Sequence, residues 1–121
     1  MNLYQEHILD HYHNPKHWGH LEHCTQESDV KNPTCGDSLH FELALVGDVV
    51  KDMAWNGEGC AISLASASLL SERVKGKTKR ELLALTSADI LKILELPLSP
   101  GRLKCGILSL EALHTALHNK K

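Results

Sequence analysis

Two things are largely missing from this sequence: an excess of charge of one sign, and a long apolar run. The 121 residues hold 13 Lys and Arg against 15 Asp and Glu, a net charge of −2, so the basic excess of a nucleic-acid-binding protein is absent. No apolar run approaches the roughly 18 residues of a membrane span, and the first thirty residues lack a signal-peptide core. We therefore expect a cytoplasmic protein that binds neither nucleic acid nor membrane.

Aromatic residues are also few, with two Trp, two Tyr and one Phe, and no Cys-x-x-Cys pair is present. A hydrophobic content of 42% with 23% charged residues is nevertheless typical of a folded chain. At this length we expect one domain, residues 1–121. The unusual feature is the number of cysteines, which are Cys24, Cys35, Cys60 and Cys105. In a reducing compartment such cysteines favour metal binding or thiol chemistry over disulfides.

The first half of the chain predicts one helix and a sheet. Large side chains repeat at helical spacing over residues 3–12, and Pro15 ends that helix by disfavouring a helical conformation at the preceding residue. A short extended segment is expected near 22–29. Strict alternation over 39–46, then a Gly-Asp turn and a second run at 49–56, predict an antiparallel hairpin.

On the second strand, Val49, Met53 and Trp55 are expected to share one face. The second half of the chain then predicts four helices. Their expected starting points are Ala61, Thr78, Ser87 and Cys105. Thr78 with Glu81 is a capping box, and Ser87 is expected to cap the helix that follows it. The last helix is expected to bury a stripe made of Ile107, Leu110, Leu113 and Leu117.

Three of the cysteines share a setting that Cys24 lacks. Cys35, Cys60 and Cys105 each lie at the boundary of an element, and two of them are expected near helix N-termini, where thiolate is favoured over thiol. With Asp37 they offer four ligands, the number of a tetrahedral zinc site, and thiolates also suit iron–sulfur clusters. The spacing alone leaves open whether the four converge or whether each cysteine is a small buried hydrophobe.

Neighbouring residues favour a shared site. Gly36 and Gly59 permit close backbone approach to an ion. Three thiolates, one carboxylate and a divalent ion carry a formal charge of about −2, which requires nearby cations, and Arg102 and Lys104 can supply them. The carboxylate is a harder ligand than a thiolate, so Asp37 is expected to detach first.

Histidines form a second candidate set. There are nine, and His7 and His11 lie four apart on the first expected helix, followed by His17, His20 and His23. Such a pair can chelate, but no companion acid or thiol motif lies beside it, so we interpret these residues as packing or solvated side chains. Cys24 has no glycine, acid or helix start beside it and is interpreted as a bystander.

These motifs together resemble the iron–sulfur cluster assembly scaffold family that includes IscU, SufU and the N-terminal domain of NifU. The resemblance covers almost the whole chain. The segments that carry it are Asp10-His11-Tyr12-His13-Asn14-Pro15, Asn32-Pro33-Thr34-Cys35-Gly36-Asp37, Gly57-Glu58-Gly59-Cys60-Ala61-Ile62-Ser63, Val74-Lys75-Gly76-Lys77 and Lys104-Cys105. It implies an α+β fold in which a three-stranded antiparallel sheet packs against about five helices.

The resemblance further implies that Cys35, Asp37, Cys60 and Cys105 meet at one exposed end and hold zinc or a nascent [2Fe–2S] cluster. Members of this kind accept persulfide sulfur from a pyridoxal-phosphate cysteine desulfurase and pass a cluster or sulfur to acceptor proteins. The protein would then be a scaffold and sulfur acceptor rather than an enzyme, although a SufU-like member acts as a zinc-dependent sulfurtransferase. We expect a monomer or weak homodimer.

Features of both subtypes are present. Lys104, directly before the third cysteine, resembles the SufU type; the IscU type has a histidine ligand at this position. A protonated lysine cannot coordinate a metal. Cys60 and Cys105 are 45 residues apart, which resembles the shorter IscU spacing. The segment 96–100 lacks the IscU chaperone-binding motif. By resemblance to SufU, Cys35 is the persulfide acceptor; by resemblance to IscU, Cys105 is.

Two other classes compete with this interpretation. One is a zinc enzyme such as a deaminase, which the absence of Pro-Cys-x-x-Cys and His-x-Glu disfavours. The other is an interaction module in which zinc only stabilises a small fold.

Overall fold

The computed structural model describes residues 3–32, 36–94 and 100–119. Its elements are α1 (Leu3–His13), β1 (Gln26–Asn32), β2 (Asp37–Val46), β3 (Val49–Glu58), α2 (Ala61–Ser71), α3 (Lys79–Leu83), α4 (Ser87–Leu94) and α5 (Pro100–His118). The sheet is antiparallel with strand order β1-β2-β3. These elements confirm the predicted α+β class, with three strands and five helices in the described ranges.

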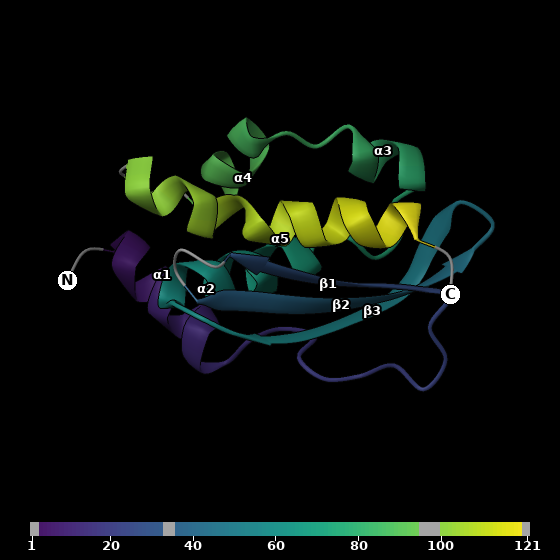
Figure 1. Ribbon diagram of the computed structural model, residues 1–121, viewed down its shortest axis with the longest axis horizontal. Helices are drawn as coiled ribbons and strands as arrows, with labels where there is room; N and C mark the ends of the chain where they lie inside the picture. Colours follow the sequence, from purple (N-terminus) through teal and green to yellow (C-terminus); the bar gives the residue numbers. More distant parts are fainter. Residues whose placement is uncertain (1–2, 33–35, 95–99, 120–121) are drawn as a thin grey trace.

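Helix α5 lies between the sheet and the pair α3 and α4 (Figure 1). On the sheet face toward α5, Phe41 is fully buried. Polar residues of β1 on that face bond to the helix backbone: the Gln26 amide donates to the carbonyl of Ala116 at 2.9 Å, and the Ser28 hydroxyl donates to that of Ala112 at 2.7 Å. Buried polar groups are satisfied in this way, so the sheet and α5 are held in a fixed register.

The faces of β3 differ from the prediction at its start. Val49 is 40% exposed, whereas Val50 is fully buried. The β2–β3 register shifts between Ala44 and Leu45, which leaves Lys51 as an extra residue in β3. A bulge of one residue reverses which side chains face the core, so simple alternation places the wrong valine inside.

Residues between α1 and β1 run beside the sheet rather than starting a strand early. The amide of Gly19 donates to the Trp55 carbonyl at 2.9 Å, and the amide of Trp55 donates to the His17 carbonyl at 3.1 Å. Trp18 forms an isolated bridge with Trp55 at this outer edge of β3. The expected strand near 22–29 is therefore displaced toward the C-terminus and begins at Gln26.

The helix caps are partly as predicted. Thr78 and Glu81 form the capping box of α3. The cap of α4 is Thr86 rather than Ser87, because the Thr86 amide donates to the Asp89 carboxylate at 2.8 Å and the Asp89 amide donates back to the Thr86 hydroxyl at 3.4 Å. Thr86 and Ser87 both carry a hydroxyl group, but only Thr86 has an acid three residues later, whereas Ser87 is followed at that distance by Ile90.

The last helix begins earlier than predicted. It starts at Pro100, where a proline costs no helical hydrogen bond because the first amides of a helix have no partner within it. Its burial is also wider than one stripe, since α5 is covered on two sides. Buried residues outside the predicted stripe include Leu108, Ala112 and Ala116, whereas Ile107, which the prediction placed in the stripe, is only half-buried. Within the described ranges, no helix combines the length and apolar character that crossing a membrane requires.

Candidate metal centre

Three predicted ligands meet at one end of the molecule. Asp37 is the first residue of β2, Cys60 directly precedes α2, and Cys105 lies near the start of α5. One ligand atom from each of the three lies within 4.8 Å of the other two. Because these residues are far apart in the sequence, their convergence is a product of the fold: β2 and α5 both begin at this end (Figure 1).

Asp37 is the most enclosed of the three, with 1% exposure. One carboxylate oxygen accepts from the Cys60 amide at 2.9 Å, and the other accepts from the Ser63 hydroxyl at 2.6 Å. Among the residues that the structure describes, Asp37 makes no salt bridge. A buried carboxylate is costly without a counter-charge, so this position suits a cation.

Cys60 occupies the N-cap of α2. Its backbone is extended, with φ −73° and ψ 164°, and its sulfur accepts from the Ser63 amide at 3.5 Å. Amide dipoles at a helix N-terminus favour the thiolate. The predicted helix N-terminal setting of Cys60 is therefore confirmed.

The donor set fits a tetrahedral zinc ion. With zinc–sulfur bonds of about 2.3 Å and zinc–oxygen bonds of about 2.1 Å, the two donors lie about 3.6 Å apart. The Cys60 sulfur is 3.8 Å from an Asp37 carboxylate oxygen. The Cys105 sulfur completes a set of two thiol groups and a carboxylate within 4.8 Å of one another, and these donor types match the chemistry of zinc and of iron–sulfur clusters.

Cys105 is placed differently from the prediction. It lies in the second turn of α5, which starts at Pro100, so the argument from a helix N-terminus is wrong for this thiol. It is also only 4% exposed. Its carbonyl accepts from the Ser63 hydroxyl at 3.2 Å, which ties α2 to α5 beside the site. The end of the molecule where the ligands meet is therefore more enclosed than expected.

The two glycines have distinct roles. A Cβ at Gly59 would overlap the Asp37 carboxylate, lying 2.8 Å from its Cγ, and φ is +155°. Gly59 thus permits close approach of Asp37 rather than of an ion. A Cβ at Gly36 would meet nothing within 4 Å, and this glycine is needed for its φ of +73°, which other residues rarely adopt.

The other three predicted site residues are described to different extents. Cys35 lies outside the described residues; in the sequence it falls between Asn32 and Asp37, which are partners in the β1–β2 register. Arg102 lies in α5, but its side chain is outside the described part. Lys104 is exposed and directly precedes Cys105.

Ser63 is the site residue that the prediction missed. Its hydroxyl contacts Asp37, the Cys60 sulfur at 3.4 Å and the Cys105 carbonyl. The available signal was its position three residues after the N-cap, where a polar side chain can bond back to the cap. Outside this centre, His11 is buried and contacts the Ser68 hydroxyl at 2.7 Å, in agreement with its predicted packing role, and Cys24 lies 4.0 Å from the Glu27 carboxylate.

Residues 3–121 match the family described as NifU-like N terminal domain. The chain belongs to this family. Its relatives include the "Zinc-dependent sulfurtransferase SufU" of Bacillus subtilis, 36% identical over 92% of this chain and 86% of that protein. They also include the "Iron-sulfur cluster assembly scaffold protein IscU" of Aquifex aeolicus, 38% identical over 94% of this chain and 73% of that protein. The predicted family resemblance is confirmed.

Solved structures of the family share the fold. A putative iron-sulfur cluster assembly scaffold protein for the SUF system, from Fervidobacterium islandicum, superposes with a TM-score of 0.80 at 28% identity, covering 93% of this chain and 94% of that one. The match with the Bacillus protein extends over 128 positions, more than the 121 residues here. That relative therefore carries residues within the matched region that this chain lacks, in line with a shorter scaffold.

Proposed function

We propose that this protein accepts persulfide sulfur from a pyridoxal-phosphate cysteine desulfurase and carries zinc or a nascent [2Fe–2S] cluster for delivery to acceptor proteins. Cys35, Asp37, Cys60 and Cys105 are the proposed ligands. The observation that carries the proposal is the meeting of Asp37, Cys60 and Cys105 ligand atoms within 4.8 Å. The names of the two relatives, a sulfurtransferase and a scaffold, support the same chemistry.

Zinc is the resident ion that we favour. Lys104 stands before the third cysteine, and a protonated lysine has no lone pair for a metal, so the ligand set is limited to three thiolates and one carboxylate. Bound zinc would supply charge compensation for the buried Asp37 and would keep the thiolates deprotonated. Arg102 and Lys104, close in sequence to Cys105, are proposed to offset the remaining negative charge.

The sulfur-transfer step is an exchange between thiols. The Cys35 thiolate attacks the outer sulfur of the desulfurase persulfide, a new sulfur–sulfur bond forms on Cys35, and the desulfurase cysteine leaves as a thiolate. No net oxidation or reduction occurs. Cys35 is proposed because the resemblance to SufU assigns it this role; Cys105 is the alternative, and its 4% exposure argues against it as the first point of attack.

Two alternatives remain distinct. In the IscU mode the [2Fe–2S] cluster is the cargo, assembled on the same ligands; the short chain and the match to the Aquifex scaffold favour it. In the structural mode zinc only stabilises the fold, as in small zinc domains. The extensive apolar core from the sheet, α2 and α5 argues against the structural mode, because this domain does not depend on a metal to bury its apolar surface.

Metal analysis of protein purified without oxygen tests the proposal. We expect a colourless solution and one zinc per chain that depends on Cys60: the Cys60→Ser variant should hold one zinc fewer than the native protein, and the matched Cys24→Ser variant should hold as much as the native protein. A brown protein with iron and sulfide would select the scaffold mode. Equal zinc in Cys60→Ser, Cys105→Ser and the native protein would overturn the proposed ligand set.

A further inference from the structure

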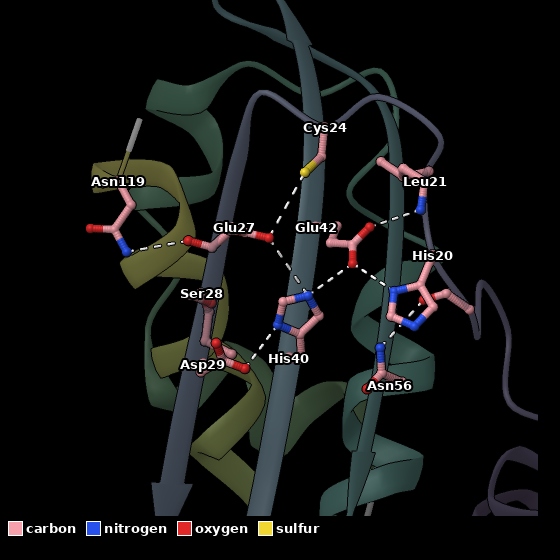
Figure 2. Close-up of polar contacts among 12 residues, drawn as sticks. His20, Leu21, Cys24, Glu27, Ser28, Asp29, His40, Glu42, Asn56 and Asn119 are labelled. Atoms are coloured by element: carbon pink, nitrogen blue, oxygen red, sulfur yellow. Dashed lines mark hydrogen bonds and ion pairs between the residues drawn. The ribbon is translucent and has the colours of Figure 1, made fainter. Parts of the chain in front are cut away.

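A second cluster of metal-ligating side chains lies on the other face of the sheet. His40 and Glu42 alternate with the core-facing residues of β2, and His20 reaches them from the segment before β1 (Figure 2). One ligand atom of each lies within 4.8 Å of the other two. Figure 2 shows the two imidazole rings on either side of the Glu42 carboxylate, with their nitrogens directed at it.

The cluster is a formed site rather than a loose surface group. The Glu42 side chain is 7% exposed, and one of its oxygens accepts from the Leu21 amide at 2.8 Å. Its other oxygen lies 2.8 Å from both His20 Nδ1 and His40 Nε2. The backbone hydrogen bond fixes the carboxylate, while the second oxygen faces both rings.

His40 is oriented by a second carboxylate. Its Nδ1 lies 2.8 Å from an Asp29 oxygen, so the proton on Nδ1 is donated to Asp29 and Nε2 points at Glu42. Histidines that bind metals usually hold the other ring nitrogen to a carboxylate in this way. Glu27 lies 3.8 Å from the same Nε2 and adds a third negative group on this side.

We propose that His20, His40 and Glu42 bind a second divalent transition-metal ion, independent of the thiolate centre. Two imidazoles and one carboxylate are a recognised set for zinc and for iron(II). Adjacent donors on a tetrahedral zinc ion lie about 3.3 Å apart at bonds of about 2.05 Å, so the two observed nitrogen–oxygen contacts of 2.8 Å need to widen by about half an ångström.

Charge and access both suit a cation. With neutral imidazoles the cluster carries three carboxylates, and a divalent ion offsets two of those charges. Binding replaces the two protons that face Glu42, on His40 Nε2 and His20 Nδ1, and both leave these nitrogens for solvent; each ring then carries its single proton on the nitrogen directed away from the ion. The His20 side chain is 72% exposed, and a hollow of about 420 Å³ lined by His40 and Asp29 opens on the same face.

The two centres are separate. Asp37 and Glu42 are five residues apart on β2, about 17 Å along an extended strand, and odd and even positions of β2 face opposite sides of the sheet. The donors here are nitrogen and oxygen, whereas the first centre has thiols. Cobalt(II) distinguishes the two, because only thiolate ligands produce an intense sulfur-to-cobalt charge-transfer band.

The test is cobalt(II) titration of the full chain after removal of metals. We expect two equivalents bound to the native protein and one to His20→Ala, with the charge-transfer band unchanged in that variant. His23→Ala, an exposed histidine in the same segment, is the matched control and should bind two. Asp29→Asn should keep the second site but weaken its affinity about 10- to 100-fold.

His20→Ala binding as much cobalt as the native protein would overturn the proposal, and so would a native protein whose entire uptake gives the thiolate band. Glu42→Gln provides a second variant that keeps the size of the side chain. If the native protein gave no charge-transfer band but still bound the equivalent of cobalt that depends on His20, the proposed function of the first centre would be refuted and the second site would still be supported.

Discussion

Ser63 contacts all three of the described candidate ligand residues without supplying a ligand itself. Its hydroxyl joins Asp37, the Cys60 sulfur and the Cys105 carbonyl. We predict that Ser63→Ala folds but binds zinc about 10- to 100-fold more weakly, since groups that orient ligands have effects of this size. Competition with a chromogenic chelator measures the affinity. Ser87→Ala, an exposed serine, should bind as the native protein does; equal affinities for all three proteins would contradict this role.

Gly59 offers a second test at the same scale. Gly59→Ala forces a methyl group onto the Asp37 carboxylate in addition to a backbone strain of about 1–3 kcal/mol. Gly47→Ala, in the open β2–β3 turn with φ +62°, has backbone strain alone. We therefore expect both variants to be less stable by urea denaturation, but only Gly59→Ala to lose the zinc ion that depends on Cys60. Full zinc occupancy in Gly59→Ala would show that Asp37 does not need this close approach.

At the scale of elements, the bulge in β3 predicts a contrast between two adjacent valines. Val50→Ala removes fully buried methyl groups and should lower the free energy of unfolding by about 2 kcal/mol. Val49→Ala, at a 40% exposed position, should change it by less than about 0.5 kcal/mol. Urea denaturation of the two variants measures both values. The reverse order would mean that β3 has the regular register that alternation predicts.

Elements were predictable where local chemistry alone decides them. The hairpin, α1 and the capping box of α3 follow from alternation, from Pro15 and from the pair Thr78 and Glu81. The bulge in β3 and the start of α5 could not be predicted from the sequence, because both depend on what packs against the element. Pro100 permits a helix start as well as a break, and only the tertiary structure shows which one occurs.

At the scale of the whole molecule, the sequence singled out the three residues that meet at the candidate centre, Asp37, Cys60 and Cys105, but not how enclosed they are. Their shared setting was a local signal, and the family resemblance supplied their convergence. The second cluster was missed because His20 was read with its sequence neighbours. Its partners, His40 and Glu42, lie on β2, on the face of the sheet that points away from the core. At such positions alternation predicts polar residues with no special role.

This second cluster also makes stability depend on pH in metal-free protein. Burial lowers the pKa of His40, but hydrogen bonds and charges from Glu42 and Asp29 outweigh it and raise that pKa overall. For Glu42 the directions are reversed: burial raises the pKa, but hydrogen bonds from His20, the Leu21 amide and His40 outweigh it and lower that pKa overall. Glu27, near His40 Nε2, adds negative charge. Both shifts favour the ionised pair in the folded state.

The His40 contribution is complete below the ordinary histidine pKa and is lost as pH rises through the raised value. The Glu42 contribution is present above the ordinary glutamate pKa and is lost as pH falls through the lowered value. The cluster should therefore stabilise the folded, metal-free protein most between about pH 4.5 and 6.5. Urea denaturation should show that the free energy of unfolding of the native protein falls as pH rises above that window. This fall should be smaller in His40→Gln and unchanged in His23→Gln. Identical pH profiles for the native protein and His40→Gln would contradict this.

Sulfur transfer tests the central claim most directly. The protein is incubated with a cysteine desulfurase and sulfur-labelled cysteine, and label on the chain is counted before and after treatment with a thiol reductant. We predict about one reductant-labile sulfur on the native protein and on Cys24→Ser, and none on Cys35→Ser. A native protein that takes up no label, or a Cys35→Ser variant that takes up as much as the native protein, would contradict the account.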